Sequence, residues 1–499
     1  MKRQEGIFNL IKSLTKQEKW YFKQFATWNA IKGSSNYIVL FDIINEMDIY
    51  DESVIKKKIQ KRSLSISFTE TKYQLYQNIM KSLHSFHLNS SVDSRIRTMI
   101  HQIEILINKA QYDETIKLIY KAKELAIHYE RFTSLSEILE KERRYIIASY
   151  NFSSMENDLN EIFKELTVTQ KKYDVQNVYF QLSDQLYLLH SKSGVIRDEK
   201  VLKLYNDVMK NKFLKNEKLA ITYEARASYY HCHKIYWFGM QNDKEYYFYC
   251  KKHLAALEEF EHMIDGKITR YIGSLYSLGL AQIDFYDFDD LLLLIAKMRA
   301  IPEKYNSGKL YINRLTIFDM SYRLELRYYS DTKQFEKGNE MIQDVLAGIE
   351  KYKLKLSELT LSLLYYELAV IKFSIKEYNE SLHYIDLLLQ NSKSDSREDI
   401  ISILRILQLI IHFELQNELL LPYIIKSTYR YLYKKERLFK VETIIMQYLR
   451  KSNKLVSRKE VIKSFTGLKE ELNLLKEDPY EKIGLEYVDF IGWLDSKIN

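Results

Sequence analysis

His231, Cys232 and His233 place imidazole and thiol groups next to one another, and these are ligands that zinc prefers. Adjacent residues on a helix point about 100° apart, so these three side chains cannot converge on one ion. His84 and His87 are three residues apart and share a helical face, but the nearby sequence supplies no third ligand. We therefore expect no metal site and no cofactor.

Motifs of known catalytic chemistry are missing from the sequence. It contains no Gly-rich phosphate loop, no GxSxG, no HExxH and no CxxC. With Cys232 and Cys250 as its only cysteines, it has neither a disulfide framework nor a Cys-based zinc motif. No convergent set of acid, base, nucleophile and metal ligand is recognisable. An enzyme enclosed in a helical shell is therefore the least favoured function, and we expect a non-enzymatic protein.

Arg226, Tyr230, His233 and Trp237 follow one another at spacings of four, three and four. That period puts them on one face of a helix predicted over 218–237. One interpretation is that the helix packs its aromatic side chains against a neighbouring helix. The other is a partner-binding surface, because Tyr, Trp and Arg are the residues that anchor interfaces.

A run of cations stands near the N-terminus. It consists of Lys56, Lys57, Lys58, Lys61 and Arg62, between a short predicted helix and a longer one. This arrangement is compatible with a helix-turn-helix that contacts nucleic acid. It is more typical of a solvated helix end, where cations favour the helix dipole. Residues 1–90 carry a net charge of +6, out of +8 for the whole chain.

The elements that must position these residues are helices. The 499 residues include only 3 Pro and 13 Gly, which leaves little material for hairpins and tight β-turns. Apolar residues recur with the helical period, for example over 155–166 and 173–190, which predicts two separate helices there. We find no secretory signal and no apolar run long enough for a membrane span, so we expect a cytoplasmic, all-α protein without membrane contact.

Residues 365–389 contain the clearest pair of helical patterns, separated by a polar break at 375–377. Leu364, Leu368 and Ile371 lie on one face of the first helix, and Leu382 and Ile385 lie on one face of the second. Such a pair cannot bury both apolar faces alone and needs similar pairs on either side. The alternative is a pair of helices in an ordinary bundle.

Further pairs repeat this pattern, and the residues KAQYDETIKLIYKAKELA around Tyr112 make it specific. Here the chain resembles the tetratricopeptide repeat (TPR) family, in which an aromatic residue follows a turn and small or apolar residues follow it by three, seven and ten positions. The matching positions are Tyr112, Thr115, Ile119 and Ala122; Phe288, Leu291, Ile295 and Met298; Phe335, Gly338, Ile342 and Val345; and Tyr378, Ser381, Ile385 and Leu388.

The sequence departs from the family in two respects. The aromatic positions of the later units are 47 and 43 residues apart, against about 34 in the family. The proline that ends each family repeat has Pro302 as its only near match. We therefore expect repeats with lengthened helices.

The resemblance implies a right-handed TPR-like α-solenoid of stacked antiparallel helix pairs. We expect an N-terminal basic helical domain over 1–90, the repeat array over 91–435 and a C-terminal helical cap over 436–499. In that family the first helix of each pair lines a concave groove that holds peptides. In this register Tyr276, Arg323, Arg327 and Tyr366 fall on the groove face. The two arginines, one turn apart, are suited to clamp a carboxylate or phosphate, unless a neighbouring helix supplies an acid that pairs with them.

We therefore expect an interaction scaffold or adaptor that binds a peptide or partner protein in the groove. The alternative is a TPR-type regulator whose N-terminal helix-turn-helix-like segment binds nucleic acid. The two hypotheses differ in one measurable respect. Binding through the N-terminal cations would weaken steeply with salt, whereas partner capture in the groove would survive reversal of those charges.

Overall fold

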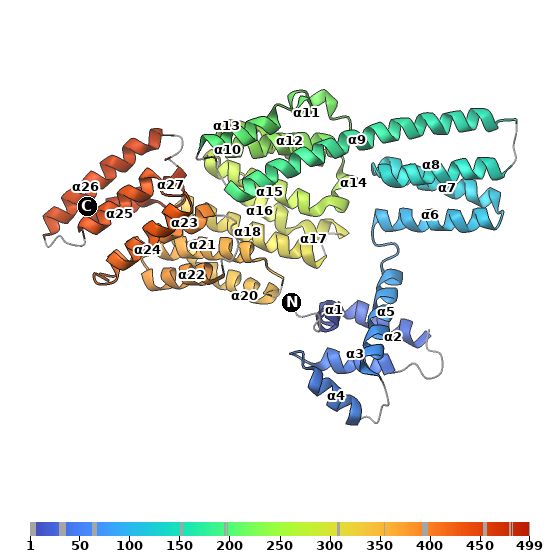
Figure 1. Ribbon diagram of the computed structural model, residues 1–499, viewed down its shortest axis with the longest axis horizontal. Helices are drawn as coiled ribbons and strands as arrows, with labels where there is room; N and C mark the ends of the chain where they lie inside the picture. Colours follow the sequence, from blue (N-terminus) through green and yellow to red (C-terminus); the bar gives the residue numbers. More distant parts are fainter. Residues whose placement is uncertain are drawn as a thin grey trace. The chain divides into compact units, whose positions relative to one another are not determined.

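The structure is a computed structural model, and it describes residues 6–28, 36–61, 67–149, 153–193, 196, 198–306, 310–353, 355–391, 398–452, 457–478, 481 and 483–498. Every regular element within these ranges is a helix, so the expected all-α class is confirmed (Figure 1). No described helix has both the length and the apolar character that crossing a membrane requires.

The chain divides into two compact units, residues 1–170 and 171–499. The helices of the first unit are α1 (Gly6–Ser13), α2 (Lys16–Trp28), α3 (Asn36–Glu46), α4 (Glu52–Lys61), α5 (Phe68–Phe86), α6 (Val92–Asn108), α7 (Tyr112–His128) and α8 (Phe132–Ala148). Helix α9 (Met155–Ser193) spans the division. The division at residue 170 coincides with neither predicted domain boundary, and those boundaries stay predictions.

The helices of the second unit are α10 (Glu199–Met209), α11 (Lys212–Lys215), α12 (Tyr223–Gly239), α13 (Asp243–Glu258), α14 (Glu261–Ile264), α15 (Ile268–Asp284), α16 (Leu291–Arg299), α17 (Ile301–Lys304), α18 (Tyr311–Asp331), α19 (Phe335–Glu340), α20 (Ile342–Tyr352), α21 (Glu358–Ser374), α22 (Tyr378–Asn391), α23 (Glu398–Glu414), α24 (Leu421–Lys434), α25 (Lys440–Ser452), α26 (Arg458–Leu474), α27 (Ile483–Glu486) and α28 (Phe490–Ile498). Most of these helices lie against the helices just before and after them. Thus α15 packs on α13, α16 and α18, while α18 packs on α19 and α21.

Two expected helix boundaries were wrong. The two helices predicted over 155–166 and 173–190 form the single helix α9, because the residues between them include no Gly or Pro to end it. The helix predicted from residue 218 begins at Tyr223. The side-chain oxygen of Thr222 accepts a hydrogen bond from the backbone N–H of Ala225, which caps the new N-terminus.

One turn geometry recurs between consecutive helices. Its central residue has a positive φ, between 48° and 64°, and none of the residues concerned is glycine. They are Ala110, Glu130, Gln241, Tyr286, Lys333, Lys376, Gln416 and Glu436. In each case the next backbone N–H bonds back to a carbonyl near the end of the preceding helix, as from Glu377 to Lys372 at 2.9 Å. This is the Schellman pattern, which satisfies carbonyl groups that a helix end leaves open.

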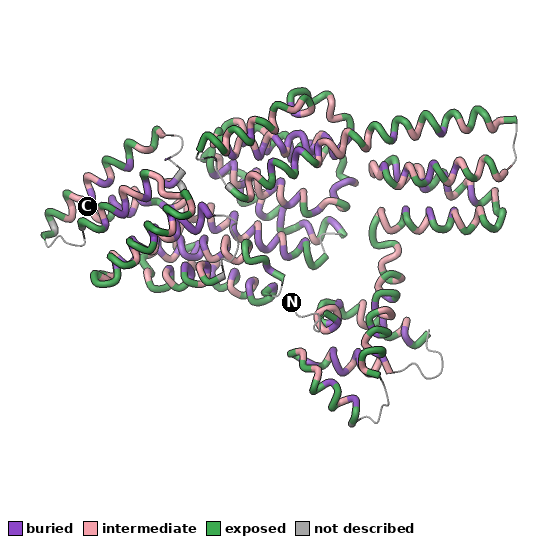
Figure 2. Tube along the Cα trace, in the orientation of Figure 1, coloured by how far each residue is buried: buried purple, intermediate pink, exposed green. Residues whose placement is uncertain are grey.

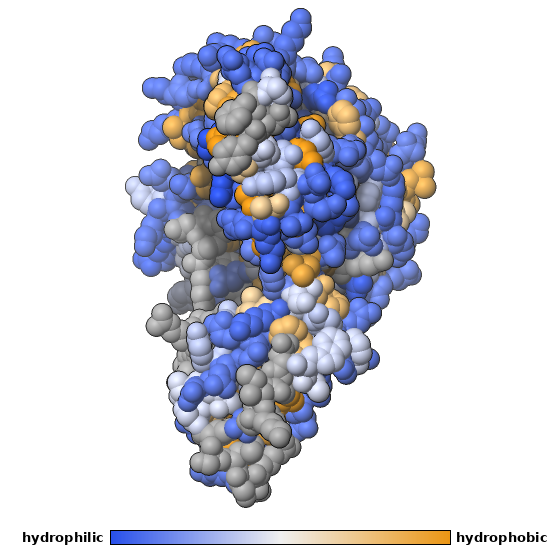
Figure 3. All heavy atoms as spheres, turned by 90° about the vertical axis from the view of Figure 1, so that its right-hand side faces the viewer, coloured by the Kyte–Doolittle hydropathy of each residue, from blue (hydrophilic) through white to orange (hydrophobic). Residues whose placement is uncertain are grey.

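The buried side chains form separate cores within the two units. In the first unit, one core joins α1–α5 and another joins α6–α8 with Ile162 of α9. In the second, the largest core runs from Leu315 to Leu494, and Figure 2 shows its buried residues along α18, α21 and α23. On the face drawn in Figure 3, apolar side chains are scattered among hydrophilic ones.

The positions that follow the aromatic residue in the repeat register are buried. Thr115, Ser381 and Gly338, the small or short residues at the first of these positions, are buried on α7, α22 and α19. A methyl group added to Gly338 would come within 2.6 Å of Ile371 on α21. A small residue there allows the two helices to approach closely.

Candidate partner-binding surfaces

Tyr276 and Arg323 of the predicted groove lie together where α15 packs on α18. The Arg323 guanidinium donates to the Tyr276 hydroxyl at 2.8 Å and lies 4.9 Å from the centre of its ring. It also donates to both carboxylate oxygens of Asp319, at 2.6 Å and 3.1 Å. Arg323 is only 7% exposed, so these contacts fix its orientation.

The acids that pair with the two arginines come from α18 itself. Asp319 precedes Arg323 by four residues, and Asp331 follows Arg327 by four, with an Nε–Oδ2 distance of 2.7 Å. The prediction named only a neighbouring helix as the source of such an acid and overlooked these two. A constant spacing of four residues through Asp319, Arg323, Arg327 and Asp331 was the sequence signal for these pairs.

Glu367 of α21 is a buried carboxyl group that sequence reasoning missed. It is 9% exposed. Burial raises the pKa of Glu367 to about 7, against the opposing effect of the Arg327 and Arg323 charges. Three consecutively packed helices, α15, α18 and α21, thus contribute charged and aromatic groups to one region.

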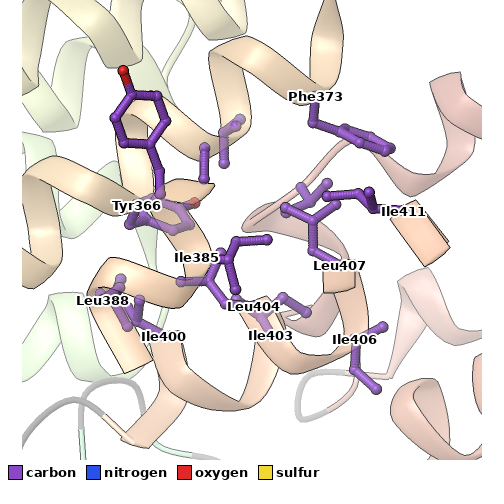
Figure 4. Packing of buried hydrophobic residues seen from close by; sticks show 14 of the residues in the cluster. Tyr366, Phe373, Ile385, Leu388, Ile400, Ile403, Leu404, Ile406, Leu407 and Ile411 are labelled. Atoms are coloured by element: carbon purple, nitrogen blue, oxygen red, sulfur yellow. The ribbon is translucent and has the colours of Figure 1, made fainter. Parts of the chain in front are cut away.

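Tyr366 does not lie on an open groove surface beside the arginines. It is 4% exposed and belongs to the large core, close to Ile385 and Leu388 in Figure 4. Its hydroxyl donates to the backbone carbonyl of Tyr487, 2.5 Å away and 121 residues later in the chain. The C-terminal part of the chain therefore covers this position.

The contacted segment, Tyr487–Asp489, has no helical structure and is held by side chains from several helices. The Tyr487 hydroxyl donates to Asp399 of α23 at 2.5 Å. Lys333, in the turn after α18, lies 3.5 Å from the Asp489 carboxylate. The contact from Tyr366 is to the backbone and the other two are to side chains, so this surface holds a stretch of chain through both.

The predicted aromatic stripe on α12 makes contacts within the second unit. It consists of Arg226, Tyr230, His233 and Trp237. The Tyr230 hydroxyl donates to Glu217 at 2.5 Å, His233 bonds the Leu214 carbonyl at 2.9 Å, and Arg226 pairs with Glu259 at 2.9 Å. The His233 ring also stacks on Tyr249. Trp237 is partly buried, and its indole N–H has no hydrogen-bond partner among the described residues. These contacts are those of the packing interpretation, and partner binding by the stripe stays a prediction.

A buried polar layer lies on an adjoining face of α12, and sequence reasoning missed it as well. His231 lies beside His253 of α13, with ring centres 5.3 Å apart, while His233 faces Tyr249. The neighbouring histidines thus point to different surroundings, as helix geometry requires. Lys234 donates to Ser277 of α15 at 3.0 Å, and burial lowers the pKa of Lys234 to about 8.

The cations near the N-terminus are partly matched by acids. Lys56 lies 2.7 Å from Glu52, and Lys58 lies 4.0 Å from Glu46. Lys57 is exposed. The side chain of Lys61 and all of Arg62 fall outside the described residues. Nucleic-acid binding by this segment stays a prediction.

Comparison with known proteins supplies no further assignment. No model of a protein family matches the chain, and no curated protein matches it.

Proposed function

We propose that the protein is a non-enzymatic interaction scaffold, a TPR-like α-solenoid of right-handed twist that binds a peptide segment of a partner protein. The proposed binding surface is made by α15, α18, α21 and α23. A cytoplasmic location belongs to the same proposal.

Two features support a solenoid. The same left-handed turn recurs between consecutive helices, and each helix packs chiefly on its neighbours along the chain. Repeated units that contact only their neighbours are the defining property of such arrays. The buried positions at which the sequence resembles tetratricopeptide repeats agree with this arrangement.

The observation that carries the proposed function is the segment Tyr487–Asp489 on this surface. Tyr366 bonds its backbone, while Asp399 and Lys333 contact its side chains. Bonds to main-chain carbonyls give affinity for a non-helical peptide irrespective of its sequence, and side-chain contacts add selectivity. Beyond this segment, α18 offers the partly exposed ion pair of Arg327 and Asp331 for a charged group of a partner.

A pull-down from the native host with the full chain as bait tests this function. Arg327→Ala removes the partly exposed cation of the surface. Arg143→Ala is the matched control, because Arg143 forms a similar intrahelical pair with Glu140 on α8. We expect the same partners with the wild type and the control, and their loss with Arg327→Ala. Partners retained by Arg327→Ala, with circular dichroism showing all three chains folded, would refute binding at this surface.

A further inference from the structure

Helix α24 has an exposed face in which tyrosines alternate with cations. We call it the basic–tyrosine face, and it consists of Tyr423, Lys426, Tyr429, Arg430, Tyr433 and Lys434. The exposed fractions of the three tyrosines are 74%, 47% and 70%. The opposite side of α24 is buried through Leu421, Ile425 and Leu432, and it packs on α23 and α25. The exposed tyrosines are therefore not needed for the core.

The cations of this face lack counter-charges. Lys426, Arg430 and Lys434 form no ion pair with any described residue, and the sequence from Leu419 to Lys435 contains no Asp or Glu. Some other exposed helical lysines differ, since Lys117 and Lys164 each pair with a glutamate one turn away. A spacing of four residues puts the three cations about 6 Å apart along the helix. The face is thus a row of positive charge at regular intervals.

The tyrosine rings of this face offer flat surfaces. Tyr429 and Tyr433 lie almost parallel, with an interplanar angle of 10° and ring centres 6.3 Å apart. Tyr423 lies about 15 Å from Tyr433 along the helix axis, given the rise per residue. Rings of this kind stack on planar groups, and the hydroxyls stay in water.

A ligand that matches both features must carry regularly spaced negative charges and accessible planar rings. Single-stranded nucleic acid has both, since its phosphates pair with Lys and Arg while its unpaired bases stack on aromatic side chains. A duplex keeps its bases stacked inside, and an acidic peptide would use only the cations. Insertion into an anionic bilayer would need a broad apolar face. The exposed leucines near this face are Leu419 and Leu420, and they lie just before α24 rather than along it.

We propose that the basic–tyrosine face of α24 binds single-stranded nucleic acid, with Lys426, Arg430 and Lys434 on successive phosphates and Tyr423 and Tyr433 stacked on bases. Binding of this kind selects single strands over duplexes and tolerates many sequences. It is independent of peptide binding at α15, α18, α21 and α23, because it uses none of the same residues.

The charge contribution is tested by fluorescence anisotropy of the full chain with labelled oligo(U) and oligo(dT). For three phosphate contacts, the logarithm of the association constant should fall with the logarithm of salt concentration with a slope of about −2. The triple variant Lys426→Ala, Arg430→Ala, Lys434→Ala should bring that slope close to zero. The control variant is Lys200→Ala, Lys203→Ala, Lys355→Ala, which removes three positive charges from exposed positions elsewhere. This control should show the same salt slope as the wild type.

The stacking contribution is tested separately at unchanged charge. Tyr423→Ala combined with Tyr433→Ala should weaken binding by roughly 30-fold or more and leave the salt slope unchanged, because each stacked base contributes about 1–3 kcal/mol. The control pair, Tyr73→Ala with Tyr120→Ala, removes tyrosines that are 65% and 61% exposed on α5 and α7. It should bind like the wild type.

Four results would overturn the proposal, provided that thermal unfolding shows the variants to be folded. The first is no binding of either oligonucleotide at low salt. The second is unchanged affinity in the tyrosine variant, which would indicate a charge effect alone. The third is tighter binding of a duplex, a polyglutamate peptide or vesicles containing phosphatidylserine. The fourth is loss of binding only when Lys56, Lys57 and Lys58 are replaced, which would place the contact on α4.

Discussion

Glu367 is the residue of the candidate site whose ionisation should be measurable. Its pKa is raised to about 7 in the folded chain from an ordinary value of 4.5, chiefly by burial. Below pH 4.5 the carboxyl group is mostly protonated in both the folded and the unfolded chain, so its ionisation does not lower the free energy of unfolding. Between pH 4.5 and 7 the folded chain holds more protons than the unfolded chain, so stability falls as the pH rises, and it levels off above pH 7.

Glu367→Gln should therefore raise the melting temperature at pH 8 and leave it nearly unchanged at pH 4.5. The gain in free energy of unfolding is at most about 3 kcal/mol, from the size of the shift. Differential scanning fluorimetry across this pH range measures it. Glu336→Gln, an exposed change on α19, is the control and should show no such pH dependence. A variant less stable than the wild type at pH 8 would mean that Glu367 supports the fold through its charge.

The sequence contains a local signal for pairings within a helix, although the prediction overlooked it, and no such signal for contacts between distant segments. On α18, Arg323 and Arg327 each pair with an aspartate four residues away, because helix geometry alone brings residues at this spacing together. The bond from Tyr366 to the Tyr487 carbonyl joins residues 121 positions apart. No local periodicity specifies that contact, since it depends on how the C-terminal segment returns to α21.

The helices themselves were largely predictable, whereas their ends were not. Apolar periodicity identifies α22 because that helix buries one face, and it identifies α21 although Tyr366–Ile371 are buried in succession there. The turns between helices are harder, since the left-handed position is usually marked by glycine. Here it is occupied by Lys333, Lys376 or Tyr286, which give no such signal. The backbone bonds that close these turns compensate for the strained residue.

Close packing between α18 and α20 depends on Gly348. A methyl group added there would lie 1.9 Å from the Phe318 ring, and that ring is itself enclosed by Tyr322 and Tyr352. Gly348→Ala should lower the free energy of unfolding by about 1–3 kcal/mol, since overpacking displaces side chains or backbone.

Gly273→Ala is the matched control on α15, because an added methyl group meets nothing within 4 Å. It should instead stabilise the chain by about 0.5–1 kcal/mol, the difference between alanine and glycine inside a helix. The urea concentrations at the unfolding midpoints of the two variants and the wild type measure these stability changes. If both substitutions were stabilising, α20 would have to lie farther from Phe318 than in this structure.

In the described part of the chain, residues 1–170 and residues 171–499 each have hydrophobic cores of their own. Ile103 belongs to the core of α6–α8, and Leu407 belongs to the large core of the second unit. Helix α9 contributes Ile162 to the first and Leu182 to a core of the second. Since cooperative unfolding follows the contacts within a core, the two units should unfold in separate transitions.

Calorimetry of the full chain with one core substitution in each unit tests this separation. Ile103→Ala and Leu407→Ala each remove a fully buried side chain, which costs about 2–5 kcal/mol within its own core. We expect each variant to lower one transition by several degrees and to leave the other in place. If α9 coupled the units, both substitutions would lower one common transition. A shift confined to one transition would therefore show that the helices after residue 170 owe their stability to their own packing.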